Sequence, residues 1–385
     1  MAGGRSRLPV ALGELVAPRP NAARARAANR GRRAGGVLGV TAGYLLLEDG
    51  TIFRGRSVGK AGVAFGEAVF TTGMTGYQET VTDPSYAEQL ICFTAPMVGN
   101  YGVAGEHDES DRPHAHAVLM RQLGGSDWAS WLARHDVVAL EEIDTRALVL
   151  RLRDAGAMRA AAVADESTLS TNDALAQVLE RPAMEGQSLV ARVSTREPYV
   201  HGDAGDVRVA LVDYGTKRSI VRRLARSGAA VTVFPHSVQP DELESFDGVV
   251  LSNGPGDPEP LHAEAEAVKE LLGRVPVLGI CLGHQLLGLA TGHTTFKLSF
   301  GHRGANHPVL DRKRGRVLVT SQNHGFAVEP SDADEATHVS LYDGTVEGFD
   351  FPELRARSVQ FHPEAGPGPH DAWPILQSWV EGLRR

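Results

Sequence analysis

Cysteine is scarce in this chain, with only Cys92 and Cys281 among 385 residues. Two thiols are too few for a disulfide framework or a cysteine-based zinc site, and their scarcity favours a reducing, cytoplasmic setting. Long hydrophobic runs are missing as well, because the longest apolar stretch, residues 275–290, contains His284 and Gln285. A membrane-spanning helix needs about 20 predominantly apolar residues, so we expect no membrane association.

An excess of positive charge is also missing. The formal net charge is -8 at pH 7, which argues against a general nucleic-acid surface. The chain has neither a Gly-x-x-x-x-Gly-Lys-Ser/Thr phosphate loop nor a Gly-x-Gly-x-x-Gly fingerprint. His114 and His116 have no carboxylate or cysteine at ligand spacing. We therefore expect no nucleotide, no metal and no cofactor in this chain.

The N-terminal stretch differs in composition from the rest. One acid, Glu14, stands against eight arginines: Arg5, Arg7, Arg19, Arg24, Arg26, Arg30, Arg32 and Arg33. A secretory signal needs an apolar core of roughly 7–15 residues, which this stretch lacks. A transit peptide is an open alternative, although serine is scarce. We favour a disordered extension over residues 1–42, with the fold beginning near Gly43.

The remaining chain divides into two blocks of different pattern. Residues 43–193 carry short strands, Gly-rich turns and two helical stretches, which predicts a smaller mixed α+β domain. The polar, glycine-containing stretch 194–206 is typical of a linker. Residues 207–385 alternate strands with helices, which predicts an α/β domain with a parallel sheet covered on both faces. Its expected strands are 207–213, 229–234, 248–252 and 275–280, and its expected helices are 216–226, 261–272 and 282–289.

Cys281 lies where one of these strands meets the next helix, with almost no loop between them. Gly279 and Gly283 flank it in a Gly-x-Cys-x-Gly sequence, the thiol counterpart of the Gly-x-Ser-x-Gly nucleophile elbow. Glycines suit such a turn because neighbouring backbone passes close to it. A lone cysteine is more often simply buried. Here the helix N-terminus beneath the sulfur favours the thiolate, which makes Cys281 a candidate nucleophile.

A candidate base and its orienting acid stand near the C-terminus, in His362-Pro363-Glu364. Residues 358–361 have the pattern of a strand end, and in extended chain residues i and i+2 point to the same face. The Glu364 carboxylate can then fix the His362 tautomer, as the third member of a triad does. His-Pro-Glu alone is more often a surface turn, so the interpretation depends on the cysteine elbow upstream.

A thiolate with a His/Glu pair performs acyl transfer: attack on a carbonyl, an acyl-enzyme, then hydrolysis. The developing oxyanion needs hydrogen-bond donors. In an elbow one donor is the backbone N–H after the nucleophile, here that of Leu282. The second is expected from Gly254, in a loop that follows the neighbouring strand.

These motifs resemble a class I, triad-type glutamine amidotransferase domain. The first block narrows the resemblance to the small subunit of carbamoyl phosphate synthetase, through Met74-Thr-Gly-Tyr-Gln-Glu79, Gly99-Asn-Tyr-Gly102 and Ile143-Asp-Thr-Arg146. The second block adds Phe300-Gly-His-Arg-Gly304 and Gln322-Asn-His-Gly-Phe326. The resemblance runs from about Gly43 to the C-terminus.

The resemblance implies a catalytic triad of Cys281, His362 and Glu364. It implies glutamine contacts at Ser85, Gly254, Gly256, Leu282, Gln285, Asn323, Gly325 and Phe326. Because Ser85 lies in the first block, the site is expected to be completed where the two blocks meet, a common place for a pocket.

The resemblance also implies a partner. The chain would hydrolyse L-glutamine to glutamate and ammonia and pass ammonia to a large subunit. That subunit, with ATP and a divalent cation, would make carbamoyl phosphate from bicarbonate for arginine and pyrimidine biosynthesis. The alternatives are an amidotransferase subunit of another synthase and a stand-alone γ-glutamyl hydrolase. The first block argues against another synthase, because those amidotransferase domains do not need it.

Overall fold

A computed structural model describes residues 41–202, 204–329 and 336–384 of the chain. The predicted extension over residues 1–42 therefore lies almost entirely outside the described residues. Within the described part, no helix is both long and apolar enough to cross a membrane.

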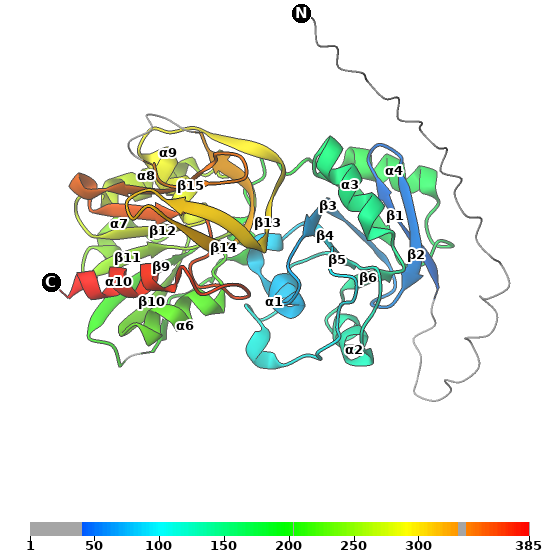
Figure 1. The fold of residues 1–385 in the computed structure, drawn as a ribbon, viewed down its shortest axis with the longest axis horizontal. Coiled ribbons are helices and arrows are strands. Elements are labelled where there is room, and N and C mark those ends of the chain that lie inside the picture. Colours follow the sequence, from blue (N-terminus) through cyan, green and yellow to red (C-terminus); the bar gives the residue numbers. More distant parts are fainter. Residues whose placement is uncertain (1–40, 203, 330–335, 385) are drawn as a thin grey trace, which may run out of the picture. The chain divides into compact units, whose positions relative to one another are not determined.

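Seven strands of the first block close into a barrel in the order β1-β2-β6-β5-β4-β3-β7 (Figure 1). Strands β1 and β2 pair as an antiparallel hairpin, with Asp49-Gly50 in the turn between them, where Gly50 has φ 84°. Leu45, Leu90 and Leu119 are fully buried and share one core cluster. The strands are β1 (Ala42–Leu47), β2 (Ile52–Ser57), β3 (Val63–Thr71), β4 (Gln89–Phe93), β5 (Ala117–Leu119), β6 (Val138–Glu141) and β7 (Met158–Val163).

Helices connect these strands and follow the last of them. Both predicted helices of this block are found, as α2 (Ser126–Arg134) and α3 (Thr145–Ala155). The Asp144 side chain caps α3 by accepting a hydrogen bond from the Ala147 N–H, which satisfies one of the free donors of the first turn. The other helices are α1 (Tyr77–Thr82), α4 (Thr171–Glu180) and α5 (Val190–Val193).

The second block is built on a ten-stranded sheet in the order β14-β13-β15-β16-β17-β12-β11-β9-β10-β8. The predicted parallel sheet is its central part, because β10, β9, β11, β12 and β17 pair in parallel. The flanking strands pair antiparallel, so the whole sheet is mixed. The central strands are β9 (Val207–Asp213), β10 (Ala229–Pro235), β11 (Gly248–Leu251), β12 (Val277–Ile280) and β17 (Ala356–Val359).

The flanking strands include a long hairpin that the alternating pattern did not predict. Its arms, β13 (Thr295–Asp311) and β14 (Arg316–Val328), pair with register shifts on both sides of the stretch 302–304. The remaining strands are β15 (Ala336–Ser340), β16 (Val346–Phe351) and β8 (Tyr199–His201). Strand β8 lies inside the stretch expected to be a linker and pairs with β10, so that stretch contributes an edge strand. The domain boundaries themselves stay a prediction.

Helices cover both faces of the central strands, as expected (Figure 1). Val249 and Val277 pack in one core cluster with residues of α8 (His262–Leu271) and α9 (Leu282–Ala290). Val250 and Leu278 pack in another with residues of α6 (Arg218–Arg226) and α10 (Trp373–Leu383). Parallel strands bring their carboxyl ends to one edge of the sheet, which is where ligands bind in such folds. Strands β12 and β17 pair in parallel, so residues 281 and 360 onward leave the sheet at that edge.

Candidate active site

The nucleophile elbow predicted from Gly-x-Cys-x-Gly is present. Cys281 is the N-cap of α9, with φ 54° and ψ -103°, a backbone conformation that side-chain-bearing residues rarely adopt. A Cβ on Gly279 would lie 2.5 Å from the Gly283 carbonyl oxygen, and one on Gly283 would lie 2.2 Å from that of Leu251. Backbone therefore fills the space on both sides of the turn, which explains why glycine occupies both positions.

The predicted base and acid are in contact. The Nδ1 atom of His362 lies 2.8 Å from Oε1 of Glu364, and both side chains are buried. The geometry differs from the extended pair that we expected, because β17 ends at Val359 and residues 363–364 form a turn. The turn is closed by a hydrogen bond from the Ala365 N–H to the His362 carbonyl. A tight turn therefore brings the two side chains together, where we had expected strand alternation to do so.

Glu364 has a second partner that sequence analysis missed. The Nζ atom of Lys217 lies 2.7 Å from the same Oε1 atom, and its side chain is 4% exposed. Lys217 follows β9 in the segment Asp213–Lys217, which we had not assigned to the site. The carboxyl end of a strand beside β11 was the available signal, since ligand-binding residues gather there.

These charges shift the protonation of the pair. Burial raises the pKa of Glu364, but the Lys217 ammonium and the His362 imidazolium outweigh it and hold that pKa well below its usual value. Burial lowers the pKa of His362, but the Glu364 carboxylate outweighs it and the pKa of His362 is raised to about 10. The resting imidazole is therefore protonated, and the buried Glu364 carboxylate holds it in place.

The thiol and the imidazole are neighbours. Interaction with the Cys281 thiol contributes to the raised pKa of His362. The Nε2 atom of His362 makes no full hydrogen bond, and the Cys281 Sγ–H donates at 3.6 Å to the carbonyl of Asn323. Once the thiol has lost its proton, a small reorientation of Sγ away from this carbonyl would let it accept a hydrogen bond from the His362 Nε2–H, which would complete the line Cys281–His362–Glu364 as a thiolate–imidazolium pair. Catalytic hydrogen bonds in unliganded sites are often loose in this way.

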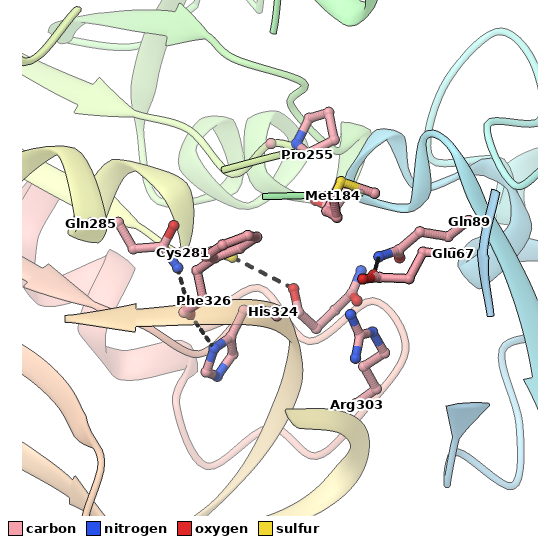
Figure 2. A pocket seen from close by; sticks show the side chains of 14 residues that line it. Glu67, Gln89, Met184, Pro255, Cys281, Gln285, Arg303, His324 and Phe326 are labelled. Atoms are coloured by element: carbon pink, nitrogen blue, oxygen red, sulfur yellow. Dashed lines mark hydrogen bonds between the residues drawn. The ribbon is translucent and has the colours of Figure 1, made fainter. Parts of the chain in front are cut away.

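A cavity of about 390 Å³ opens beside the Cys281 sulfur (Figure 2). Seven of the eight predicted glutamine contacts line it: Ser85, Gly254, Gly256, Gln285, Asn323, Gly325 and Phe326. Leu282 does not, because its side chain packs in the core between sheet and helix. Glu67, Gln89, Met184 and Arg303 also line the cavity and were not predicted.

The expected oxyanion donors are free. Neither the Leu282 nor the Gly254 backbone N–H has a hydrogen-bond partner among the residues that the structure describes. A Cβ on Gly254 would lie 2.3 Å from the Tyr214 carbonyl oxygen, so only glycine fits this loop beside α9. Gln285 is less free than we expected, because its Nε2 donates at 2.8 Å to the Phe326 carbonyl. Its side chain therefore fixes the cavity wall.

Residues of the first block complete the site from the barrel side. The buried Asp83 carboxylate accepts hydrogen bonds from the Ser85 N–H at 2.9 Å and from Asn323 Nδ2 at 3.0 Å. Asn253 Nδ2 donates to Ser85 Oγ at 2.9 Å. These bonds join β14 and the loop after β11 to the segment after α1, as the place of Ser85 in the chain predicted.

A second cavity, of about 400 Å³, adjoins the imidazole of His362. Asn323 lines both cavities. Thr71, Glu79 and Gly304 lie along its other walls.

His284, three residues after the nucleophile, takes no part in the site. Its side chain is fully buried, stacks on Phe349 and lies 2.8 Å from the Ser358 hydroxyl. Burial lowers the pKa of His284 to about 3, so it stays neutral. These contacts are those of a histidine packed in the local core.

Comparison with known proteins decides between the remaining alternatives. Residues 45–162 match the carbamoyl-phosphate synthase small chain, CPSase domain, and residues 210–381 match glutamine amidotransferase class-I. A protein of Parasynechococcus marenigrum is 46% identical over 359 residues, covering 86% of this chain and 93% of its own. A protein of Vibrio parahaemolyticus is 43% identical over 371 residues, which cover 89% of this chain and 98% of that protein. Both are named carbamoyl phosphate synthase small chain.

The chain belongs to the carbamoyl-phosphate synthase small-chain family. The resemblance stated from the motifs is thereby confirmed, as is the α/β amidotransferase domain preceded by a smaller α+β block. The match over the first block also disfavours the amidotransferase of another synthase, because that block belongs to the small-chain domain.

Proposed function

We propose that this chain is the glutamine-hydrolysing subunit of a carbamoyl phosphate synthase, with Cys281 as nucleophile, His362 as general acid and base, and Glu364 as the group that orients it. The observation that carries the proposal is the elbow thiol at the mouth of a cavity, with a buried imidazole–carboxylate pair beside it. The family assignment supports the same activity.

The mechanism follows from these positions. The Cys281 thiolate attacks the amide carbon of glutamine, and the resulting oxyanion accepts hydrogen bonds from the Leu282 and Gly254 N–H groups. Each such donor contributes roughly 2.7–4 kcal/mol to the transition state. His362 gives its proton to the leaving nitrogen, so ammonia departs and a γ-glutamyl thioester remains. Water, deprotonated by His362, then hydrolyses the thioester to glutamate and regenerates the Cys281 thiolate beside the protonated His362.

The fate of ammonia implies a partner. The described residues have no nucleotide-binding motif, so the ATP-dependent steps belong to a large subunit that holds ATP and a divalent cation. The cavity of about 400 Å³ beside His362 is a candidate exit for ammonia, since it adjoins the group that protonates the leaving nitrogen. The complex would make carbamoyl phosphate from bicarbonate in the cytoplasm, for arginine and pyrimidine biosynthesis. This chain would need no cofactor for its own step.

Trapping the thioester tests the nucleophile. The full chain with its large subunit is mixed with glutamine, quenched in acid within one turnover and digested for mass spectrometry. We expect a glutamyl adduct on the peptide that contains Cys281. Cys92 provides a matched control, because it is buried in the barrel core. The adduct should persist in Cys92→Ala and vanish in Cys281→Ala; an adduct that survives in Cys281→Ala refutes the proposed mechanism.

A further inference from the structure

Three buried side chains from three different strands converge at the wall of the glutamine cavity. They are His302 on β13, His324 on β14 and Glu347 on β16. One atom of each, His302 Nδ1, His324 Nε2 and Glu347 Oε1, faces the others, and these atoms lie within 4.8 Å of one another. None of the three atoms has a hydrogen-bond partner, although all three are shielded from solvent. Buried polar atoms without partners are rare in native proteins.

In each imidazole, the ring nitrogen that faces away from the cluster (the outer nitrogen) already has a hydrogen-bond partner. His302 Nε2 lies 2.8 Å from Oδ2 of Asp343, and His324 Nδ1 donates at 2.8 Å to the carbonyl of Phe326. In the neutral form of each ring, a hydrogen on the outer nitrogen leaves the inner nitrogen with a lone pair that points into the cluster. Metal-binding histidines show this arrangement, in which a carboxylate or carbonyl holds the far N–H and orients the ring.

The Glu347 carboxylate has only imidazoles as its basic neighbours. Its side chain is 0% exposed, and its Oε2 atom accepts a hydrogen bond from Gln322 Nε2 at 2.8 Å. No lysine or arginine pairs with it among the described residues. The groups nearest to Oε1 are His302 Nδ1 at 3.5 Å and His324 Nε2 at 4.0 Å. A buried carboxylate is costly without a positive partner, so this position favours a cation.

We propose that His302, His324 and Glu347 bind a divalent transition-metal ion of the Zn²⁺ type. Two imidazoles and one carboxylate suit zinc, whereas magnesium and calcium prefer oxygen ligands alone. Tetrahedral zinc with bonds of about 2.1 Å places its ligand atoms about 3.4 Å apart. The observed 3.5 and 4.0 Å, and the limit of 4.8 Å on the third distance, are longer than this, so the side chains would have to close in on the ion. A water molecule would complete the coordination.

The proposed metal site lies close to the protein surface. The Asp343 side chain, which holds His302, is 40% exposed, so an ion can reach the cluster through the turn between β15 and β16. The metal would tie the β13–β14 hairpin to β16. His302 and His324 are direct cross-strand partners, and His324 stands between Asn323 and Gly325 in the cavity wall. The ion would thus support the cavity and would not take part in the reaction.

Metal content and thermal stability test the site. The full chain is stripped with a chelator, dialysed, and titrated with ZnCl₂ while bound metal and melting temperature are measured. Cys281→Ala serves as the parent, because a catalytic thiol can itself bind zinc. The test variants are His302→Asn and Glu347→Gln. His338→Asn is the matched control, because His338 is a buried histidine with an unpaired Nε2 outside the cluster.

We expect one zinc ion per chain in the parent and in His338→Asn, and affinity at least 10-fold weaker in both test variants. At a hundredfold excess over the dissociation constant, the parent should melt about 5–10 °C higher with zinc than without it. A parent that takes up no stoichiometric zinc, or test variants that bind it equally well, overturns the proposal. Both readouts are independent of glutamine hydrolysis, so they stand or fall separately from the proposed function.

Discussion

Lys217→Met tests the charge network on which the His362–Glu364 pair depends. The lysine is nearly isosteric with methionine, so the substitution removes the ammonium and keeps most of the packing. The variant leaves the Glu364 carboxylate buried with His362 as its one cationic partner, and it also removes a positive neighbour of the buried Glu109. Removing one partner of a buried ion pair typically costs about 3–5 kcal/mol. We expect a loss of that size in the free energy of unfolding at neutral pH.

The loss should depend on pH in a defined direction. The pKa of Glu364 is lower in the folded protein than its usual 4.5, so its contribution is present above that value and is lost as pH falls. Lys217 has a pKa raised above its usual 10.5, because Glu364, Glu109 and Asp83 outweigh its burial, so its contribution is present below that value. Between about pH 5 and 10 both contributions are therefore complete. The difference between variant and wild type should be largest there and should shrink below pH 4.5.

Urea unfolding from pH 4 to 9 measures this difference. Lys313→Met is the control, because Lys313 pairs with Asp350 while its side chain is 57% exposed, and exposed pairs contribute at most about 1 kcal/mol. A Lys217→Met variant that is as stable as Lys313→Met across this range would refute the account of the buried network.

Three further perturbations follow from the same contacts. Gly283→Ala would place a Cβ 2.2 Å from the Leu251 carbonyl oxygen, so urea unfolding should show a loss of about 1–3 kcal/mol in the free energy of unfolding. Gly382→Ala is the control, because open space surrounds that position, and it should be neutral or slightly stabilising. Equal stability of the two variants would contradict the steric account. His362 should hold its proton up to about pH 9 in ¹⁵N NMR spectra, because Glu364 raises its pKa to about 10 despite burial. The stability that this proton contributes is complete below pH 6.5 and should be lost as pH rises through about 10. An imidazole that is neutral at pH 7 would contradict this. Asp83→Ala would leave the Asn323 amide unpaired at a cost of about 1–3 kcal/mol and should raise the KM for glutamine in steady-state assays, and an unchanged KM would show that the bond to Asn323 does not shape the cavity.

Local steric requirements explain what the sequence predicted well. The elbow was predictable because a side chain at position 279 or 283 would clash with backbone only one turn or one strand away, so both positions need glycine. The strand and helix bounds around it were predictable for the same reason, since periodicity reports which face of each element is buried. Residues 207–213, for example, form β9 over the expected range.

Contacts between distant segments were not predictable in this way. Lys217 and Glu364 are 147 residues apart, and Asp83 and Asn323 are 240 apart. No local pattern marks such pairs, because their side chains meet only after the central sheet and the barrel have formed. The His362–Glu364 contact shows a subtler failure: the pairing was expected from strand alternation, but a turn produces it.

The most direct test of the central claim compares two nitrogen sources. Cys281→Ala is combined with a carbamoyl phosphate synthetase large subunit, and carbamoyl phosphate formation is measured with glutamine and, separately, with ammonia. The account predicts that glutamine-driven synthesis is lost while ammonia-driven synthesis persists at the wild-type rate. Continued synthesis from glutamine by this variant would contradict it.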